Sequence, residues 1–295
     1  MASPGAARAV SRPTLFARLV KIEHSVYALP FAYAGAFLAA GGWPGAGPFL
    51  WITVAMVGAR SAAMALNRLI DAGIDARNPR TAARELPAGR LGRREVAVFT
   101  AVSVALLVIA AFNLSEPCRY LWPIPLAAFV VYPYTKRFTW FCHYFLGMTL
   151  GLAPAAAWVA VTGSASTEAW LLFFAVTLWV GGFDALYAVF DLEFDRQQGL
   201  HSLPVAVGER GSIAVAALSH AGTVGLLAAV GGLAGLGWVY WAGLAACAAL
   251  LAWPHLDIAR RGLREVGMSF MTVNGAVGLV YGAVDGHEAH AHLTQ

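Results

Sequence analysis

Charged residues are scarce in this chain of 295 residues. Asp, Glu, Lys and Arg make up 12% of it, about half of the roughly 25% that is usual in soluble domains. Hydrophobic residues make up 59%, and the mean hydropathy is +0.64. Such a composition excludes intrinsic disorder and argues against a water-soluble enzyme. The few cysteines, Cys118, Cys142 and Cys247, lie far apart and form no CxxC pair, which argues against a disulfide framework or a metal knuckle.

Long stretches without a charged residue predict a polytopic, all-α membrane protein. Because a transmembrane helix needs about 20 apolar residues, we count nine expected helices, and glycine-rich tracts at 41–45 and 231–237 divide the longest stretches. The expected spans lie within 23–60 (two), 95–116, 119–136, 137–168, 168–184, 210–257 (two) and 265–285. Residues 1–22 are expected to be a cytoplasmic or interfacial segment, 23–285 a single transmembrane domain, and 286–295 a short histidine-containing tail.

The basic residues predict how the chain is oriented. With nine spans, all of the 20 Lys and Arg residues except Arg119 fall on the same side as the N-terminus. The positive-inside rule then places the N-terminus and the two longest loops in the cytoplasm and the C-terminus outside. For a bacterial chain this means the inner membrane. The basic N-terminal segment lacks an apolar core and a cleavage site, so we do not interpret it as a signal peptide.

Carboxylates gather at the cytoplasmic end of the second expected span. Asn67, Asp71 and Asp75 follow one another at intervals of four residues, and this spacing places all three on one face of a helix. Arg60 lies seven residues before Asn67 and therefore faces the same side. A charged residue at that depth in a membrane helix is a functional candidate, because burying it is costly.

The same pattern returns 120 residues later, at the end of the sixth expected span. Tyr187, Asp191 and Asp195 repeat the interval of four residues, and Asp184 precedes them. One such carboxylate face is most often a solvated helix end. Two of them on one side of the membrane indicate a shared site.

Two carboxylate faces at a membrane boundary repel one another and require a cation. All-oxygen ligands favour a hard ion, and an ion that keeps waters and shares phosphate oxygens is typically Mg²⁺. Basic residues follow both acidic motifs and also lie between them. Acid, metal and arginine together predict a diphosphate site. The candidates for diphosphate or substrate contact are Lys21, Arg60, Arg68, Arg77, Arg80, Lys136, Arg137 and Asp184.

At these residues the chain resembles the UbiA-type intramembrane aromatic prenyltransferases, over about residues 15–285. The resemblance is carried by four separate parts of the sequence. These are the Asn67-x3-Asp71-x3-Asp75 motif, the basic stretch from Arg77 to Gly89, the stretch Tyr132-Pro-Tyr-Thr-Lys-Arg-Phe-Thr139, and the second motif from Asp184 to Pro204. One departure is Arg68, where many members of the family have an acidic residue.

The resemblance implies nine helices around a central cavity that opens to lipid, and transfer of a polyprenyl group from an allylic diphosphate to an aromatic acid. It implies Mg²⁺, with two ions expected, held by Asn67, Asp71, Asp75, Asp191 and Asp195. The expected catalytic residues are Asp71, Asp75, Asp191, Asp195, Tyr187 and Arg137. The nearest subgroup resembles 4-hydroxybenzoate polyprenyltransferases of quinone synthesis. The Asn67-Arg68 pair is also associated with a branch that makes menaquinone through futalosine.

Several alternatives stay open. The acceptor could equally be a dihydroxynaphthoate acid, and haem or chlorophyll prenylation belongs to the same family. A carboxylate-lined cation transporter would use the same acids as an ion path. A CDP-alcohol phosphotransferase also uses membrane aspartates, but its glycine and final acids are missing after Ala76-Arg77. Lipid is an expected partner and nucleic acid is not. Chain length of the donor and oligomeric state are not encoded in these patterns.

Overall fold

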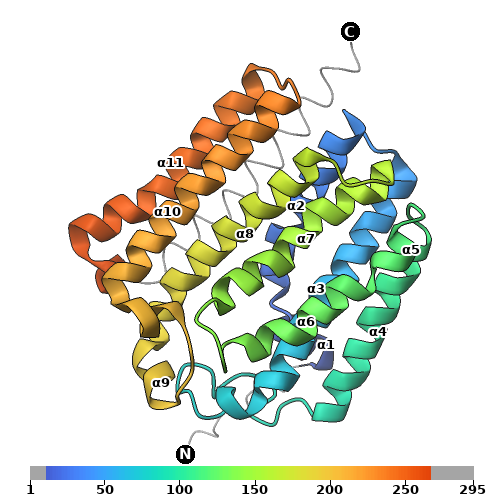
Figure 1. Cartoon of the computed structure of the whole chain (residues 1–295). Coiled ribbons are helices and arrows are strands. Elements are labelled where there is room, and N and C mark those ends of the chain that lie inside the picture. Colours follow the sequence, from blue (N-terminus) through green and yellow to red (C-terminus); the bar gives the residue numbers. More distant parts are fainter. Residues whose placement is uncertain (1–10, 267–295) are drawn as a thin grey trace, which may run out of the picture.

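The computed structural model describes residues 11–266, apart from the side chains of 22–28, 264 and 266, and this range contains helices and no strands. An all-α fold is therefore confirmed for the described residues (Figure 1). The helices are α1 (Arg12–Leu19), α2 (Ile22–Ala40), α3 (Ala46–Asp75), α4 (Arg93–Phe112), α5 (Cys118–Leu121), α6 (Pro123–Thr135), α7 (Cys142–Thr162), α8 (Thr167–Ala188), the 3₁₀ turn η1 (Val189–Asp191), α9 (Leu192–Gln197), α10 (Leu203–Leu233), α11 (Trp238–Arg261) and α12 (Leu263–Val266).

Six of the described helical segments are long and apolar enough to cross a membrane: α3, α4, α7, α8 through α9, α10 and α11. Two further expected spans are shorter. The apolar part of α2 is Leu29–Ala40, and α6 has 13 residues because the helix is interrupted at Trp122, before Pro123. The ninth expected span and the histidine-containing tail lie outside the described residues. The count of nine and the side on which the C-terminus lies stay predictions.

Glycine-rich breaks separate neighbouring helices where the sequence predicts them. Gly41 ends α2 in the left-handed region, at φ 59°, and its N–H donates to the Leu38 carbonyl. A residue without a Cβ adopts this conformation at little cost. The break between α10 and α11 also falls inside the expected tract, with Gly235 at φ 63°. Turn chemistry in the sequence therefore located both boundaries.

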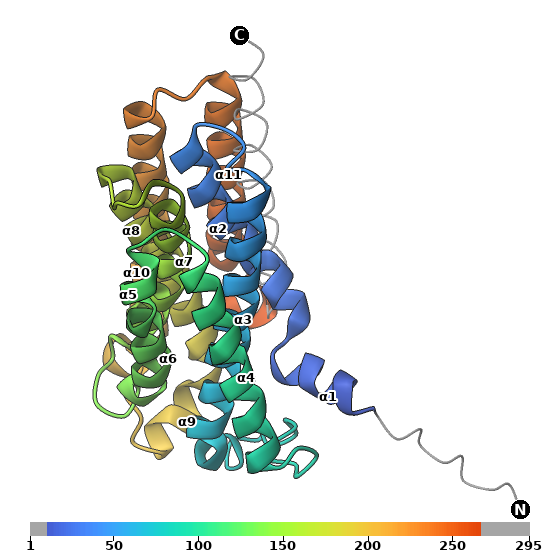
Figure 2. The same ribbon diagram turned by 90° about the vertical axis from the view of Figure 1, so that its right-hand side faces the viewer.

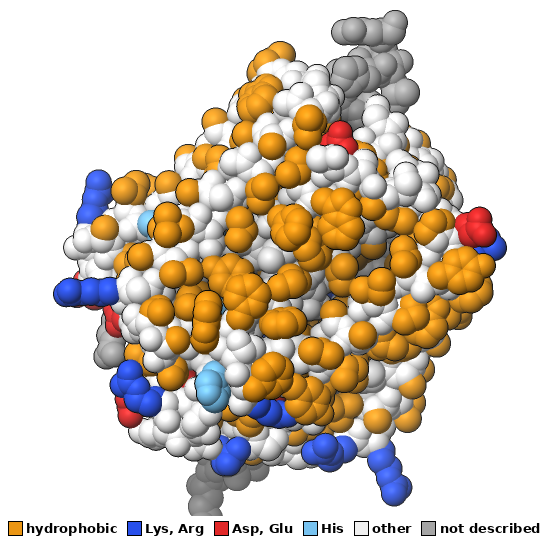
Figure 3. All heavy atoms as spheres, in the orientation of Figure 1, with side chains coloured by type: hydrophobic (Ala, Val, Ile, Leu, Met, Phe, Trp, Pro, Cys, Tyr) orange, Lys and Arg blue, Asp and Glu red, His pale blue; other side chains and the backbone are white. Residues whose placement is uncertain are grey.

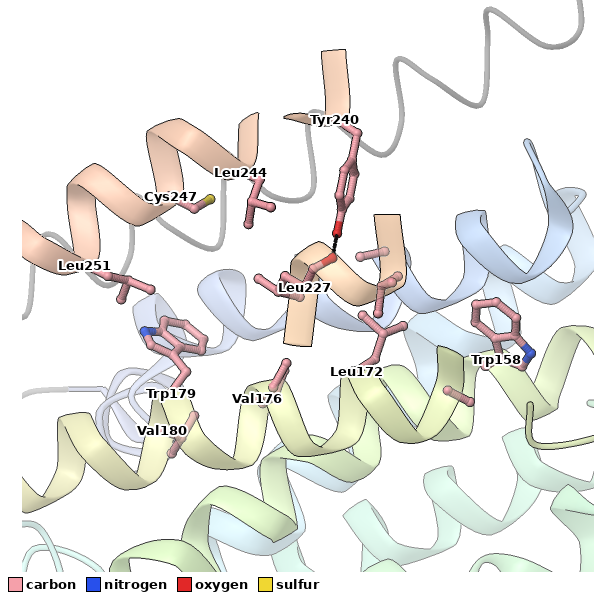
Figure 4. Close-up of a cluster of buried hydrophobic side chains, with 14 residues drawn as sticks. Trp158, Leu172, Val176, Trp179, Val180, Leu227, Tyr240, Leu244, Cys247 and Leu251 are labelled. Carbon is pink, nitrogen blue, oxygen red and sulfur yellow. Dashed lines mark hydrogen bonds between the residues drawn. The ribbon is translucent and has the colours of Figure 1, made fainter. Parts of the chain in front are cut away.

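A core of large apolar side chains joins α7, α8, α10 and α11. Trp179 and Leu172 of α8 pack with Leu227 of α10 and Leu251 of α11 in one buried cluster. Figure 4 shows Tyr240 of α11 reaching across to α10, where its hydroxyl donates to the Leu227 carbonyl at 2.7 Å. A buried tyrosine hydroxyl needs such a partner. This cluster fixes α10 and α11 against the helix that carries the second acidic motif.

α7 and α8 approach one another closely at two glycines of α7. A Cβ added to Gly147 would lie 2.3 Å from the carbonyl oxygen of Thr177, and one added to Gly151 would lie 2.5 Å from that of Phe173. Small residues at this spacing let two membrane helices touch along their backbones. The pair thus forms a rigid support beside the acidic motifs.

We expect Gly147→Ala to destabilise the protein by about 1–3 kcal/mol, because the added methyl group must push two backbones apart. Gly225→Ala is a matched control, since a Cβ on Gly225 of α10 meets nothing within 4 Å and alanine is the better helix former. The thermal midpoint in detergent, followed by size-exclusion chromatography after heating, measures both. Equal midpoints for the two variants would contradict the close approach.

The two acidic motifs lie at the same end of the bundle. Figures 1 and 2 show α9 and the connection between α3 and α4 at the lower end, which is also the end nearest to α1. Figure 3 shows apolar side chains over the middle of one face, with Lys and Arg gathered along its lower and left margins. An apolar belt with a charged margin is the surface expected of a protein embedded in lipid.

Candidate active site

The first motif lies on the last two turns of α3, as its spacing predicts. Asp71 and Asp75 are buried, with 3% and 6% of their surface exposed. The Asn67 side-chain amide donates to Asp71 Oδ2 at 3.1 Å, across one helical turn. These three side chains therefore share a face that points into the protein.

Asp71 is paired with the basic residues that follow α6. Lys136 Nζ lies 2.6 Å from Asp71 Oδ2, and Arg137 Nη2 lies 3.5 Å from Asp71 Oδ1. Arg137 also donates to the Ile70 carbonyl at 3.2 Å. Two positive charges beside one buried carboxylate stabilise its charged form. The loop after α6 thus joins the first motif, as the sequence predicts.

Asp75 is paired with arginines of its own segment. Arg84 Nη1 lies 2.8 Å from both carboxylate oxygens, and Arg68 Nη1 lies 3.9 Å from Oδ2. Arg68 is itself buried, at 5% exposed. The residue that departs from the usual family pattern therefore faces the site as a cation.

The second motif does not lie on one continuous α-helix, so the expectation that its residues share a single helical face was wrong. α8 ends at Ala188, a 3₁₀ turn covers Val189–Asp191, and the short α9 begins at Leu192. A 3₁₀ turn has three residues per turn instead of 3.6, so it changes the direction in which the following residues project. Tyr187, Asp191 and Asp195 consequently do not form one straight row.

The connection at residues 76–92, between α3 and α4, links the two motifs directly. Asn78 Nδ2 donates to Asp191 Oδ1 at 3.2 Å, and Arg80 Nε donates to the same oxygen at 2.9 Å. Arg80 also bonds to Asp191 Oδ2 and to the Tyr187 hydroxyl, and its guanidinium lies 4.7 Å from the centre of the Tyr187 ring. Segments more than 100 residues apart in sequence therefore meet at one place.

Charge keeps Arg80 protonated in this position. Burial acts to lower the pKa of Arg80, but the hydrogen bonds and negative charge of Asp191 outweigh burial and raise that pKa above its ordinary value. Asp195, on α9, forms no ion pair among the described residues, although the charges of Asp191 and Lys136 act on it. Lys136 is therefore placed between the first motif and the second.

Two further cations of the predicted site are Arg60 and Lys21. Arg60, on α3, has a buried Nε atom that lacks a hydrogen-bond partner. Lys21 precedes α2 in a left-handed conformation, at φ 48°, which is unfavourable for a residue with a side chain. Burial, and then the charges of Arg68, Arg84, Arg80 and Arg60, lower the pKa of Lys21 from 10.5 to about 8. Cations that form no ion pair with a carboxylate among the described residues, one of them with a buried guanidinium nitrogen, are suited to an anionic ligand.

Arg77, another predicted site residue, lies at the surface of the protein. It is exposed and lines a hollow of about 410 Å³ beside the site, together with Ile70, Ile74, Arg137 and Leu200. Arg137 reaches both this hollow and Asp71. Arg137 is therefore shared between the hollow and the first motif.

Four residues near the site were not predicted as functional. Asn78 and Arg84 hold Asp191 and Asp75 respectively, and Tyr132 lies where charges from both motifs act on it. His143, on α7, bonds to Asp184 at 2.7 Å. Asn78, Arg84 and Tyr132 lie within stretches that carry the family resemblance, although no role was assigned to them. His143 carried no such signal, because its partner Asp184 comes from a distant segment.

The oxygen ligands fit Mg²⁺ that shares its coordination with a diphosphate. No group of three Asp, Glu, His or Cys residues among those described could hold a metal ion alone. Mg²⁺ differs from zinc in this respect, since it is usually held by one or two carboxylates together with waters and substrate phosphates. Asp71 and Asp75 on one side, and Asp191 and Asp195 on the other, match that ligand set.

The family to which the chain belongs follows from its sequence. A model of the UbiA prenyltransferase family matches residues 28–275, which is most of the chain. The chain belongs to the UbiA prenyltransferase family. Membership in the UbiA family, with six membrane-length helices, makes it an integral membrane prenyltransferase.

Relatives within the UbiA family carry names that describe an aromatic substrate. The 4-hydroxybenzoate octaprenyltransferase of Cupriavidus necator is 34% identical over 261 residues, which cover 85% of this chain and 89% of the relative. The enzyme of the same name from Klebsiella pneumoniae is 32% identical, over 90% of this chain and 92% of its own length.

Solved structures of UbiA homologues share the fold. The apo structure of a homologue from Aeropyrum pernix K1 superimposes with a TM-score of 0.82 at 36% identity, covering 89% of this chain and 97% of the homologue. A homologue from Archaeoglobus fulgidus, bound to GPP and Mg²⁺, has a TM-score of 0.71 at 18% identity over 94% of this chain and 99% of its own.

Proposed function

We propose that this protein transfers a polyprenyl group from an allylic polyprenyl diphosphate to a 4-hydroxybenzoate-like aromatic acid in respiratory quinone synthesis. The observation that carries the proposal is the contact of Arg80 and Asn78 with Asp191, which joins the two acidic motifs in one basic site. The names of the bacterial relatives support the aromatic acceptor. We place the site on the cytoplasmic side of the inner membrane, because the basic residues gather at this end.

Asn67, Asp71 and Asp75 would hold magnesium on one side of the donor, and Asp191 and Asp195 on the other. When bound, Mg²⁺ supplies the positive charge that makes diphosphate an acceptable leaving group. Two ions suit the two separate carboxylate pairs. The Archaeoglobus homologue bound to GPP and Mg²⁺ supports this part of the proposal.

The basic side chains of the site would receive the negative charge that develops on the departing diphosphate. Lys136 and Arg80 each lie between a carboxylate and the open site, so each can turn from its carboxylate towards the diphosphate oxygens. Arg60 and Lys21 form no ion pair with a carboxylate among the described residues. Guanidinium groups and diphosphate oxygens form strong charge-assisted hydrogen bonds.

Two tyrosine rings are placed to stabilise the allylic cation left by C–O cleavage. The Tyr187 ring lies under the Arg80 guanidinium, and the Tyr134 ring lies under that of Arg137 at 4.5 Å. Aromatic faces that already attract a guanidinium also attract a carbocation. The electron-rich ring of the acceptor would then attack ortho to its hydroxyl, forming the new C–C bond, and its proton would pass to Asp191 or to the released diphosphate.

The hollow beside the site gives the acceptor a path from water. We propose that the acceptor carboxylate binds Arg137, which is shared between the hollow and Asp71, while the prenyl tail arrives from lipid. Replacement of Arg137 by methionine should raise KM for 4-hydroxybenzoate by about 10–100-fold, since a hydrogen bond to a charged group contributes about 1.5–3 kcal/mol. Steady-state kinetics with each substrate varied in turn measure this. A rise in KM for the donor alone would assign Arg137 to the diphosphate instead.

The second candidate acceptor is a dihydroxynaphthoate acid of menaquinone synthesis. The buried Arg68 beside Asp75 is the observation that favours it, because the Asn67-Arg68 pair resembles the menaquinone branch. The two acids offer the same carboxylate and an activated ring. Only direct competition between them separates the two proposals.

The test uses the purified protein in detergent with geranyl diphosphate and each acid, with and without Mg²⁺. We expect a prenylated aromatic acid to form only with Mg²⁺, and mass spectrometry identifies the product. Absence of product from both acids, together with Mg²⁺ flux into proteoliposomes, would overturn the proposal in favour of a cation transporter. Product formation in EDTA would overturn the role of the metal.

The pKa of Lys21 predicts how donor binding depends on pH. Lys21 titrates near pH 8 in the free protein, whereas a bound diphosphate would favour its charged form and raise that pKa. The donor phosphates are already ionised, since their last pKa is about 6. Binding therefore weakens as the lysine loses its proton, and KM for the donor should rise about tenfold between pH 7 and pH 9.

The variant Lys21→Arg separates this titration from others in the site. Arginine keeps its charge over the whole range, so the rise in KM between pH 7 and pH 9 should disappear in that variant. Lys21→Met should bind the donor weakly at every pH. A pH profile that is the same in the arginine variant and in the unchanged protein would show that another group titrates.

A further inference from the structure

His143 contacts both the start of the second acidic motif and the end of the connection that follows this motif. It is the second residue of α7 and is almost fully buried, with 5% of its side chain exposed. Its Nδ1 atom lies 2.7 Å from Asp184 Oδ2, and its Nε2 atom lies 3.1 Å from the backbone nitrogen of Leu203. One side chain thus connects α8 with the start of α10.

The two contacts fix the proton of the imidazole. The Leu203 nitrogen is a backbone N–H, which can only donate, so Nε2 accepts this bond and carries no proton. Nδ1 therefore carries the proton and donates it to the Asp184 carboxylate. The ring is held as a single neutral tautomer, with both nitrogens used.

These contacts hold the segment of the second motif at both of its ends. Asp184 precedes Tyr187 and Asp191, and Leu203 is the first residue of α10, just after the connection that follows α9. The same connection is bonded to the loop after α6, since the His201 N–H donates to the Lys136 carbonyl at 2.6 Å. These bonds act together with the contacts of Asn78 and Arg80 with Asp191 to position the second carboxylate pair.

The two carboxylate oxygens of Asp184 differ in their contacts. Oδ2 is bonded to His143, and Oδ1 has no hydrogen-bond partner among the described residues. The Asp184 side chain is 30% exposed, and its charge, together with that of Asp71, acts on Tyr132 between the motifs. The histidine therefore orients a carboxylate that remains available to a ligand.

We propose that His143 is a positioning residue of the transferase. It orients Asp184 and holds the second carboxylate segment at the distance that a magnesium–diphosphate complex requires. This inference rests on the proposed function. A hydrogen bond from a histidine to a carboxylate of this kind typically affects metal affinity or activity by about 10–100-fold when it is removed.

Three variants separate the two bonds of the ring. His143→Asn places an amide donor near the position of Nδ1 and keeps the bond to Asp184. His143→Gln reaches towards Leu203 and loses the donor to Asp184. His143→Leu loses both bonds. His201→Leu is the matched control, because His201 is exposed and its backbone, not its side chain, takes part in the hydrogen bonds near the site.

Metal binding is the first measurement, since it does not depend on turnover. Mn²⁺ is titrated into the purified protein with the non-reactive geranyl thiolodiphosphate, and free Mn²⁺ is followed by electron paramagnetic resonance. We expect His143→Leu and His143→Gln to weaken Mn²⁺ binding by about 10–100-fold, and His143→Asn to recover most of the affinity. His201→Leu should bind as the unchanged protein does. Steady-state kcat with Mg²⁺ should follow the same order.

Other outcomes overturn the inference. Unchanged Mn²⁺ affinity in folded His143→Leu, or equal losses in the asparagine and glutamine variants, would mean that the histidine serves only the fold. If the leucine variant does not fold, the comparison of asparagine with glutamine decides alone. An unchanged protein that binds Mn²⁺ with the diphosphate but gives no product would contradict the proposed function and leave the metal titration of the variants as a separate result.

Discussion

Replacement of Asp71 or Asp191 by asparagine should lower kcat by about 10²–10³-fold, which is the usual loss when one group that stabilises transition-state charge is removed. Each aspartate lies at the centre of a different ion-pair cluster, Asp71 with Lys136 and Asp191 with Arg80. Asparagine keeps the size of the side chain and one oxygen, but it removes the charge that would hold the metal. The measurement is product formation from geranyl diphosphate and 4-hydroxybenzoate at saturating Mg²⁺.

A matched control for these variants is Asp257→Asn. Asp257 pairs with Arg261 on the outer helix α11 and contacts neither acidic motif, so this variant should keep its activity. The double variant of Asp71 and Asp191 should have a kcat only slightly below that of the less active single variant, because both aspartates act on one leaving group. Full turnover by either single variant would end the proposed mechanism.

Replacement of Arg80 by methionine should lower kcat/KM for the donor by about 10²-fold or more. Arg80 bonds to both oxygens of Asp191 and to the Tyr187 hydroxyl, so its loss weakens the link between the motifs and removes a cation from the site. Lysine should restore only part of the activity, because a single ammonium group cannot replace the two-nitrogen contact of a guanidinium.

Arg90→Met tests whether the effect belongs to Arg80 or to the basic stretch as a whole. Arg90 lies in the same 76–92 connection but pairs with Glu85, outside the contacts between the motifs. We expect its kcat/KM to stay within a few-fold of the unchanged protein, because this ion pair contacts neither acidic motif. Equal losses in the two methionine variants would mean that the connection acts only through its total charge.

Local patterns in the sequence predicted the parts of the site that depend on a single helix. The interval of four residues placed Asn67, Asp71 and Asp75 on one face of α3, because helix geometry alone determines that face. Glycine-rich tracts located the breaks after Ala40 and Leu233 for a similar reason, since a left-handed residue ends a helix wherever it occurs. These features need no knowledge of distant contacts.

The rest of the site depends on contacts that no local pattern encodes. The 3₁₀ turn at Val189–Asp191 interrupts a spacing that reads as a helix in sequence. Asn78 has no charge and no motif of its own, yet it bonds to Asp191 across 113 residues. His143 resembles an ordinary core histidine until its two partners are known. Such roles emerge only when separate segments are packed together. The functional roles of all these residues stay predictions until the variants are measured.

Three aspartates of the site already have a basic neighbour: Lys136 for Asp71, Arg84 for Asp75 and Arg80 for Asp191. We expect the pyrophosphate product to leave only as these neighbours go back to their aspartates, since a bare carboxylate at a membrane surface is unfavourable. Departure of the product and return of the basic side chains to their aspartates would then be one event. A slow step at the end of each catalytic cycle would follow, visible as a burst of prenylated acid before the steady rate.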